Sequence, residues 1–197
     1  DLHDVVVNEI MADPDPSAGL PQVEWLELYN RSAKIIDLAM LRIQDETGAP
    51  TAIPGYLLLP DRYVVLTATT NAATLQAATP GKVIGVSMSG TLLNNDDDVL
   101  IISDFNSNEI DRVAYDMSWH TDAGKADGGW SLERINPNLP CLGSENWHSC
   151  PNLPGGTPGA KNASFQNTTD TESPRLLAAF PESATSILLT FSEGLDK

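Results

Sequence analysis

The chain has 197 residues, which is enough for one domain with a sizeable core and part of a second. Its 27 acidic and 11 basic residues give a net charge of −16, and the basic residues are scattered singly along the sequence. This charge excludes direct binding to nucleic acid or to an anionic membrane surface, because both require a cationic patch. No apolar run approaches the ~18 residues of a membrane-spanning helix, so no membrane insertion is expected either.

Alternating apolar and polar residues predict β-strands along most of the chain. The first is expected at residues 5–10, before the turn-forming residues 13–16. Further strands are expected, in chain order, at residues 24–30, 35–38, 41–44, 63–67, 83–86, 99–103, 110–115 and 130–135. The one predicted helix is short and Ala-rich, at residues 71–78. Short strands separated by frequent turns indicate an all-β sandwich rather than alternating strands and helices.

The composition changes in the last part of the chain. Pro, Gly, Asn, Thr and Ser dominate residues 151–170, which is typical of an exit from a domain. Two more strands are expected at residues 173–181 and 186–193. Because two strands alone are marginally stable in water, we expect this pair to belong to a second domain that is cut short at the end of the sequence.

Three segments carry the most specific pattern of the sequence. They are EWLELYN at residues 24–30, WSLERINP at residues 130–137 and GGTPGAKN at residues 155–162. Together with Asn8-Glu9-Ile10 in the first strand, and in this order, they resemble the lamin tail domain family. The resemblance implies an immunoglobulin-like β-sandwich over residues 1–162.

The C-terminal strand pair resembles the beginning of a bacterial Ig-like domain, a type that occurs in tandem on surface proteins. We therefore expect a linker at residues 163–172 and a partial Ig-like segment at residues 173–197. Nuclear lamins place a heptad coiled coil before this domain and carry basic nuclear-targeting segments, and the sequence has neither. The resemblance therefore implies a bacterial relative that is extracellular, periplasmic or attached to the cell surface, without lamin roles in filaments or chromatin.

The two cysteines, Cys141 and Cys150, lie in a segment rich in Pro, Gly and Ser. A segment of this composition is usually exposed, whereas unpaired cysteines are usually buried, so a disulfide is favoured. The bond would contribute roughly 2–3 kcal/mol to stability and would place the protein outside the cytosol. Two separate thiols in a reducing compartment are the alternative.

The charged residues of the motifs allow two interpretations; they are Glu9, Glu27, Glu133 and Arg134. Acid–base catalysis needs two carboxyl groups in a cleft with different pKa values and a defined substrate position. Alternatively, Arg134 forms structural ion pairs with one or two of the glutamates, because its planar guanidinium matches a carboxylate. No nucleophile or third catalytic partner accompanies these residues, so we expect structural ion pairs and no enzyme activity.

The densest acidic run consists of Asn94, Asn95, Asp96, Asp97 and Asp98. Calcium binds six to eight oxygen atoms, and Asp and Asn often supply them. The run lacks the glycine and the final glutamate of an EF-hand loop, and the same residue types are favoured in hairpin turns. We therefore expect a turn, with a calcium site as the alternative.

The remaining chemistry-bearing residues indicate no site. The three histidines, His3, His120 and His148, lack a second His or Cys at zinc-ligand spacing. Trp25 and Trp130 are expected in the core. The other two tryptophans, Trp119 and Trp147, lie in predicted loops. We expect them to pack against the ends of the sandwich, with stacking on sugar rings or partner side chains as the alternative.

These features predict a non-catalytic structural or interaction module of a secreted or cell-surface bacterial multidomain protein, without a resident cofactor. Its expected partners are another protein or a cell-surface glycan, and the adjoining Ig-like domain. Two alternatives remain open. The module is either an accessory domain of a larger hydrolase whose catalytic part lies elsewhere, or a surface module stabilised by calcium.

Overall fold

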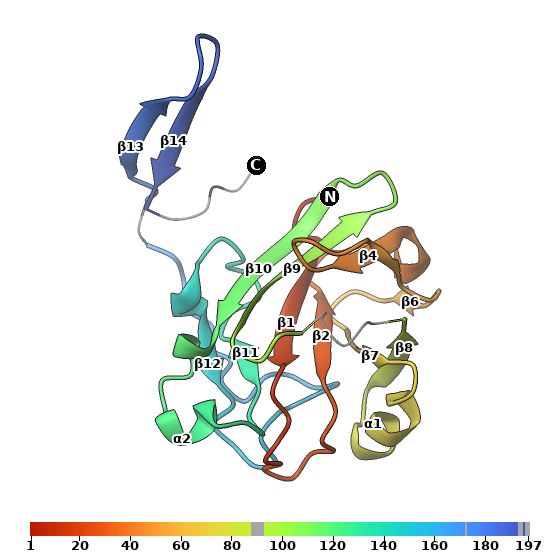
Figure 1. Cartoon of the computed structure of the whole chain (residues 1–197). Helices are drawn as coiled ribbons and strands as arrows, with labels where there is room; N and C mark the ends of the chain where they lie inside the picture. The colour runs from red at the N-terminus through yellow and green to blue at the C-terminus, as the bar shows by residue number, and fades with distance from the viewer. Residues whose placement is uncertain (88–92, 172, 193–194, 196–197) are drawn as a thin grey trace.

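Two β-sheets lie face to face in the computed structural model of the protein and enclose a large apolar core (Figure 1). The structure describes residues 1–87, 93–171, 173–192 and 195. The arrangement confirms the predicted all-β, immunoglobulin-like sandwich. In the described part of the chain, no helix is both long enough and apolar enough to cross a membrane.

The first sheet has six strands. Their order across the sheet is β12 (Trp147–Ser149), β11 (Leu132–Arg134), β1 (Val5–Met11), β2 (Trp25–Asn30), β7 (Tyr63–Ala68) and β8 (Lys82–Val86). Neighbouring strands are antiparallel except for β7 and β8, which run parallel. A parallel pair needs a crossover connection, and the predicted helix, α1 (Ala72–Ala78), lies in this connection. The parallel pairing itself was not predicted.

The second sheet has four strands, in the order β10 (Glu109–Asp116), β9 (Asp97–Asp104), β4 (Leu41–Gln44) and β5 (Thr51–Ala52). β9 and β10 form a long hairpin. A small separate pair joins β3 (Ile36–Asp37) to β6 (Leu57–Leu58). The short helical turns are η1 (Leu38–Met40), η2 (Met117–Trp119), α2 (Ala123–Ala126) and η3 (Ser144–Asn146).

Both faces of the first sheet are buried. Leu26 and Leu28 of β2 belong to the main core between the two sheets. Trp25 of the same strand belongs to a second apolar cluster, together with Leu75 of α1. Successive side chains of a strand point to opposite faces, so this second cluster covers the outer face of the sheet.

A β-bulge in β1 decides which face its charged residue occupies. The pairing between β1 and β2 changes register between Val7 and Glu9. A bulge adds one residue to a strand and so changes the alternation of its side chains. Val7 and Ile10 therefore both belong to the main core, whereas Glu9 lies on the outer face, close to Trp25.

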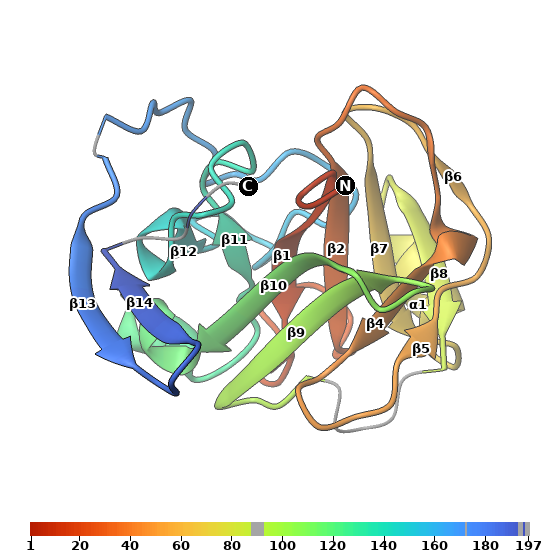
Figure 2. The same cartoon turned by 90° about the horizontal axis from the view of Figure 1, so that it is seen from above.

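β13 (Leu176–Pro181) and β14 (Ile187–Phe191) form a two-stranded hairpin that projects from the sandwich (Figures 1 and 2). Nearly every residue of the two strands is exposed. They match the strands predicted at residues 173–181 and 186–193. The Ig-like domain to which we assign them stays a prediction, as does the linker at residues 163–172.

Candidate functional site

Three glutamates lie in a row on the outer face of the first sheet. In the strand register, Glu9 of β1 is the partner of Glu27 of β2 on one side and of Glu133 of β11 on the other. All three residues are 0% exposed. We refer to Glu9, Glu27 and Glu133 as the carboxylate cluster. It brings together charged residues that the sequence singled out in three separate strands.

Residues 155–164, called the exit segment here, cover the carboxylate cluster. The segment includes the third sequence motif, and it donates one backbone N–H to each carboxyl group. The three bonds are Thr157 N–H to Glu9 Oε1 (2.7 Å), Gly159 N–H to Glu27 Oε2 (2.5 Å) and Ser164 N–H to Glu133 Oε2 (2.7 Å). The most specific motifs of the sequence therefore meet at one place in the fold.

Two buried asparagines attach the end of the exit segment to the sheet. The Asn8 side-chain amide donates to Glu27 Oε1 (2.8 Å) and to Asn162 Oδ1 (2.7 Å). The Asn162 amide donates in return to the backbone carbonyls of Asn8 and Arg134, each at 2.9 Å. These bonds satisfy polar groups that burial would otherwise leave unpaired.

The exit segment approaches the sheet so closely that one position requires glycine. Gly159 has a φ of +81°, and a Cβ atom placed there would lie 2.5 Å from the Cα of Gly81. Gly81 directly precedes β8. A residue with a side chain would be strained in this backbone conformation and would also push the two backbones apart.

The hydroxyl group of Thr157 lies between two carboxyl groups, 3.3 Å from Glu9 Oε2 and 2.8 Å from Glu133 Oε1. A hydroxyl has only one hydrogen to donate, so both contacts are hydrogen bonds only when a carboxyl proton supplies the second. Burial and then the charge of Glu133 raise the pKa of Glu9 to about 8. We infer that protonated Glu9 donates to Thr157, which donates to Glu133.

The third member of the cluster is subject to the same forces. Burial and the neighbouring Glu9 raise the pKa of Glu27 well above its ordinary value. No cation contacts the cluster at ion-pair distance in the described part of the chain. The cluster therefore reduces its own charge by holding protons, because a buried carboxylate without a counter-charge is costly.

The geometry of the cluster does not suit catalysis. Its oxygen atoms accept hydrogen bonds from the exit segment, from Asn8 and from Ser131. Two sizeable hollows of the molecule, about 640 and 320 Å³, are lined by other residues. Among the described residues, no three His, Cys, Asp or Glu side chains are placed to hold a metal ion. The cluster therefore attaches one segment of the chain to another.

The comparison with known families identifies the fold. A sequence model of the lamin tail domain matches residues 1–116. The chain belongs to the lamin tail domain family. No curated protein sequence matches it. In this lamin tail domain, β11, β12 and the exit segment lie beyond the matched residues, although they complete the first sheet and its cover.

Arg134 corrects the prediction of ion pairs with the glutamates. Its Nη2 pairs with Asp111 Oδ2 of β10 at 3.1 Å, and its Nε donates to the carbonyl of Val7 at 2.7 Å. The reason is strand alternation: Glu133 points to the outer face of the first sheet, so the next residue points to the other face. Arg134 therefore joins the two sheets of the lamin tail domain, and the glutamates are held by other groups.

The predicted disulfide between Cys141 and Cys150 is not formed in the structure. Cys150 is fully buried behind β12, and its Sγ donates to the carbonyl of Asn152 at 3.3 Å. Burial and the neighbouring Glu133 raise the pKa of this thiol. Cys141 instead lines the hollows of about 640 and 320 Å³. The expected location outside the cytosol therefore loses this support.

The acidic run at residues 94–98 forms the turn and the first residues of β9. Asp97 and Asp98 are paired with β10 in the strand ladder. The carboxyl group of Asp98 accepts the N–H groups of Asn94 (3.1 Å) and Val99 (2.7 Å). The carboxyl group of Asp98 is thus engaged in the turn. Among the described residues, no three His, Cys, Asp or Glu side chains are grouped to hold a metal ion, and the calcium site stays a prediction.

One arrangement that resembles a catalytic pair lies elsewhere. His120 Nδ1 is 2.9 Å from the Oγ of Ser149. Ser149 is 0% exposed, and the cavity beside His120 has a volume of only about 10 Å³, which is room for no more than one water molecule. Burial, with nearby Lys125, lowers the pKa of His120 to about 4. The pair has no space for a substrate.

The tryptophans follow their predicted positions in part. Trp25 is buried in the second apolar cluster, as expected. Trp130 is only partly buried, and the Nζ of Lys125 lies 4.2 Å from the centre of its ring. Trp119 and Trp147 pack against each other and against the main core. Packing against the ends of the sandwich was the favoured expectation, and exposed stacking was its alternative.

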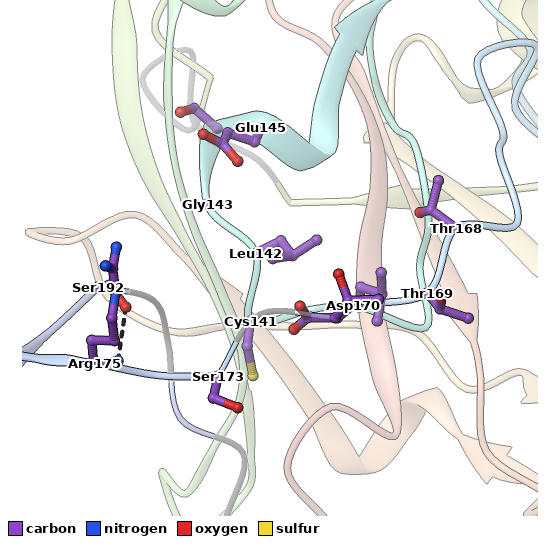
Figure 3. A pocket seen from close by; sticks show the side chains of 13 residues that line it. Cys141, Leu142, Gly143, Glu145, Thr168, Thr169, Asp170, Ser173, Arg175 and Ser192 are labelled. Carbon is purple, nitrogen blue, oxygen red and sulfur yellow. Dashed lines mark hydrogen bonds between the residues drawn. The ribbon is translucent and has the colours of Figure 1, made fainter.

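The larger hollow, about 640 Å³, lies between the loop at residues 139–145, the chain after the exit segment and the base of the hairpin (Figure 3). Hydroxyl groups such as that of Thr168 line much of it, and Arg175 donates its backbone N–H to Ser192 at its edge (2.9 Å). This hollow is wide and open to solvent.

Sequence reasoning missed the residues that act as partners. Asp111, Thr157 and Asn162 each bond a motif residue, yet none of them was singled out. A signal existed for two of these residues. Thr157 and Asn162 stand inside the third motif, and buried glutamates without a nearby cation require donors of this kind.

The carboxylate cluster predicts that stability falls as pH rises. Glu9 has an ordinary pKa of 4.5 and a folded-state pKa of about 8. Between these values the folded protein keeps a proton that the unfolded chain releases, so each rise in pH favours unfolding. Urea unfolding is expected to show a free energy of unfolding that is lower at about pH 8.5 than at about pH 5.

A substitution separates Glu9 from other titrating groups. Glu9→Gln removes the charge with little change of shape, and its stability is expected to fall less between the two pH values. The control is Glu109→Gln, at a residue with a 42% exposed side chain, which should keep the wild-type pH dependence. A wild-type stability that is constant or rises over this interval contradicts the protonated cluster.

The buried ion pair gives a second prediction. Asp111→Asn leaves Arg134 buried without a counter-charge, and it is expected to lower the free energy of unfolding by about 3–5 kcal/mol. Arg112→Gln breaks the exposed pair with Glu109, which should cost less than about 1 kcal/mol. Urea unfolding at one pH measures both variants. Equal costs for the two would refute the role of Asp111 in joining the sheets.

Proposed function

We propose that this lamin tail domain is a non-catalytic structural module of a secreted or cell-surface bacterial protein, and that it fixes the position at which the chain continues into its next module. The observation that carries the proposal is the carboxylate cluster, because each of its three members holds the exit segment. The glutamates of the motifs are thus engaged in anchoring.

The distribution of exposed apolar residues supports contact with an adjoining module. Leu177, Phe180 and Ile187 are 64%, 65% and 67% exposed, and all three lie on the β13–β14 hairpin. No charged residue interrupts either strand. Strands of this composition are normally covered by further β-structure, so the hairpin suits pairing with a neighbouring domain.

Hydrogen exchange tests the anchoring role. The amide hydrogens of Thr157, Gly159 and Ser164 are expected to exchange only when the whole domain unfolds, because each is bonded to a buried carboxyl group. Thr157→Val removes the bridging hydroxyl and should increase the exchange rate of all three by roughly tenfold, the effect of losing about one hydrogen bond. NMR measures each rate separately.

The matched control is Thr185→Val, at an exposed threonine in the turn of the hairpin. This substitution should leave exchange in the exit segment unchanged. If the exit segment of the wild-type protein exchanges as fast as the hairpin turn, it is not anchored, and the proposal fails.

Cell fractionation tests the proposed location. The protein that contains this domain is expected in the medium or in the cell-envelope fraction of the bacterium that makes it, when detected by immunoblotting against residues 1–197. A cytosolic enzyme blotted in parallel reports leakage. Detection in the cytosol alone would contradict a secreted or surface module.

A further inference from the structure

The two sheets of the sandwich leave a hollow along one side. β10 is the outermost strand of the second sheet, and β12 is the outermost strand of the first. Residues of both strands line a hollow of about 320 Å³, together with residues of the loop that follows β11. This volume is at the lower end of the range for small-molecule sites in proteins.

Aromatic rings form one wall of the hollow. Trp119 of η2 and Trp147 of β12 lie with their ring centres 5.7 Å apart and their planes tilted by 35°. The guanidinium carbon of Arg134 lies 4.9 Å from the centre of the Trp147 ring. Trp147 is thus fixed between two neighbours, and Trp119 is the partly exposed end of the stack. A ring of this kind offers a flat apolar surface to a ligand.

The hollow is lined by basic rather than acidic side chains. Arg112 and Arg134 line it, and no Asp or Glu does so among the residues that the structure describes. This composition is notable in a chain with 27 acidic and 11 basic residues. Each arginine is paired with a carboxylate outside the hollow, Arg112 with Glu109 and Arg134 with Asp111, so a ligand would meet guanidinium N–H donors here rather than a large net positive charge.

The two arginines differ in how many of their N–H donors are already bonded within the protein. Arg134 is buried and already bonds Asp111, Val7 and the carbonyl of Pro140. Arg112 is 43% exposed, and its one hydrogen bond within the described residues runs from Nε to Glu109 (2.9 Å). A guanidinium carries five N–H donors, and its terminal pair suits a carboxylate. Arg112 is therefore the residue placed to receive an anion.

We propose that this hollow binds an aromatic carboxylate, with its ring against Trp119 and its carboxylate at Arg112. Apart from His3, whose Nδ1 lies 3.1 Å from Asp111 Oδ1, the remaining wall is mostly apolar, formed by residues such as Val113, Ala114 and Leu142, and it offers few partners to the hydroxyl groups of a sugar. This argument favours an aromatic acid over an acidic sugar. The site is separate from the carboxylate cluster and independent of the proposed anchoring role.

NMR titration of the whole chain with phenylacetate tests the site. The indole N–H signals of Trp119 and Trp147 are expected to shift with saturation at about millimolar concentrations, the affinity typical of so small a ligand. Phenylacetamide has the same ring without the charge, and it should bind at least about tenfold more weakly. Absence of saturable shifts with phenylacetate, or equal binding of the amide, would overturn the proposal.

Variants identify the residues. Arg112→Gln should raise the dissociation constant for phenylacetate about tenfold. This side chain is largely exposed, so loss of folding is not a concern. The matched control is Arg62→Gln, at an exposed arginine that does not line the hollow, and it should bind like the wild type. Equal affinities of the two variants would refute the assignment to Arg112.

Two further ligands distinguish the chemical classes from which the natural ligand could come. The tripeptide Gly-Gly-Phe carries the same aromatic carboxylate at a peptide end, so binding tighter than that of phenylacetate would identify a protein C-terminus as the natural source. Weaker binding of the tripeptide would identify a free aromatic acid instead. Glucuronate represents acidic sugars, and tighter binding of glucuronate than of phenylacetate would overturn the aromatic assignment.

Discussion

The buried row of carboxyl groups is the constraint on which the rest of the structure depends. Three glutamates on adjacent strands occupy the outer face of the first sheet, and among the described residues no arginine or lysine lies at ion-pair distance from them. Such a row is tolerable only if donors surround it and if protons reduce its charge. The exit segment supplies the donors. The fold of residues 155–164 and the protonation of the cluster therefore both serve to make the burial of three carboxyl groups tolerable.

The cover over the glutamates makes this sandwich differ from the usual two-layer arrangement. An antiparallel sheet commonly exposes one face to water, and its strands then alternate apolar and polar residues. Here the outer face is covered twice, by α1 over the apolar cluster around Trp25 and by the exit segment over the glutamates. The alternation in residues 24–30 thus reflects two buried environments, one apolar and one hydrogen-bonded, rather than a core and a solvent.

The elements that could be predicted from the sequence are those encoded by the pattern of neighbouring residues. The strands at residues 5–10, 24–30 and 130–135, and the short helix, are encoded by neighbouring residues, and the structure contains all of them. The partner of Arg134 was not predictable in this way, because it depends on which face of β11 meets Asp111 of a distant strand. The parallel pairing of β7 with β8 and the cover of residues 155–164 are likewise contacts between distant segments, which strand periodicity does not report.

The position of the exit segment also determines how the domain would respond to mechanical tension. A pull on the chain beyond residue 168 would first load the bonds of Thr168 to Asn136 and of Gln166 to Ile135, and then the bond between Ser164 and Glu133. The bond of Gly159 to Glu27 would follow, and then the bond of Thr157 to Glu9. The bonds to the row of carboxyl groups would thus break one after another under tension. The force that breaks them would depend on which carboxyl groups are protonated.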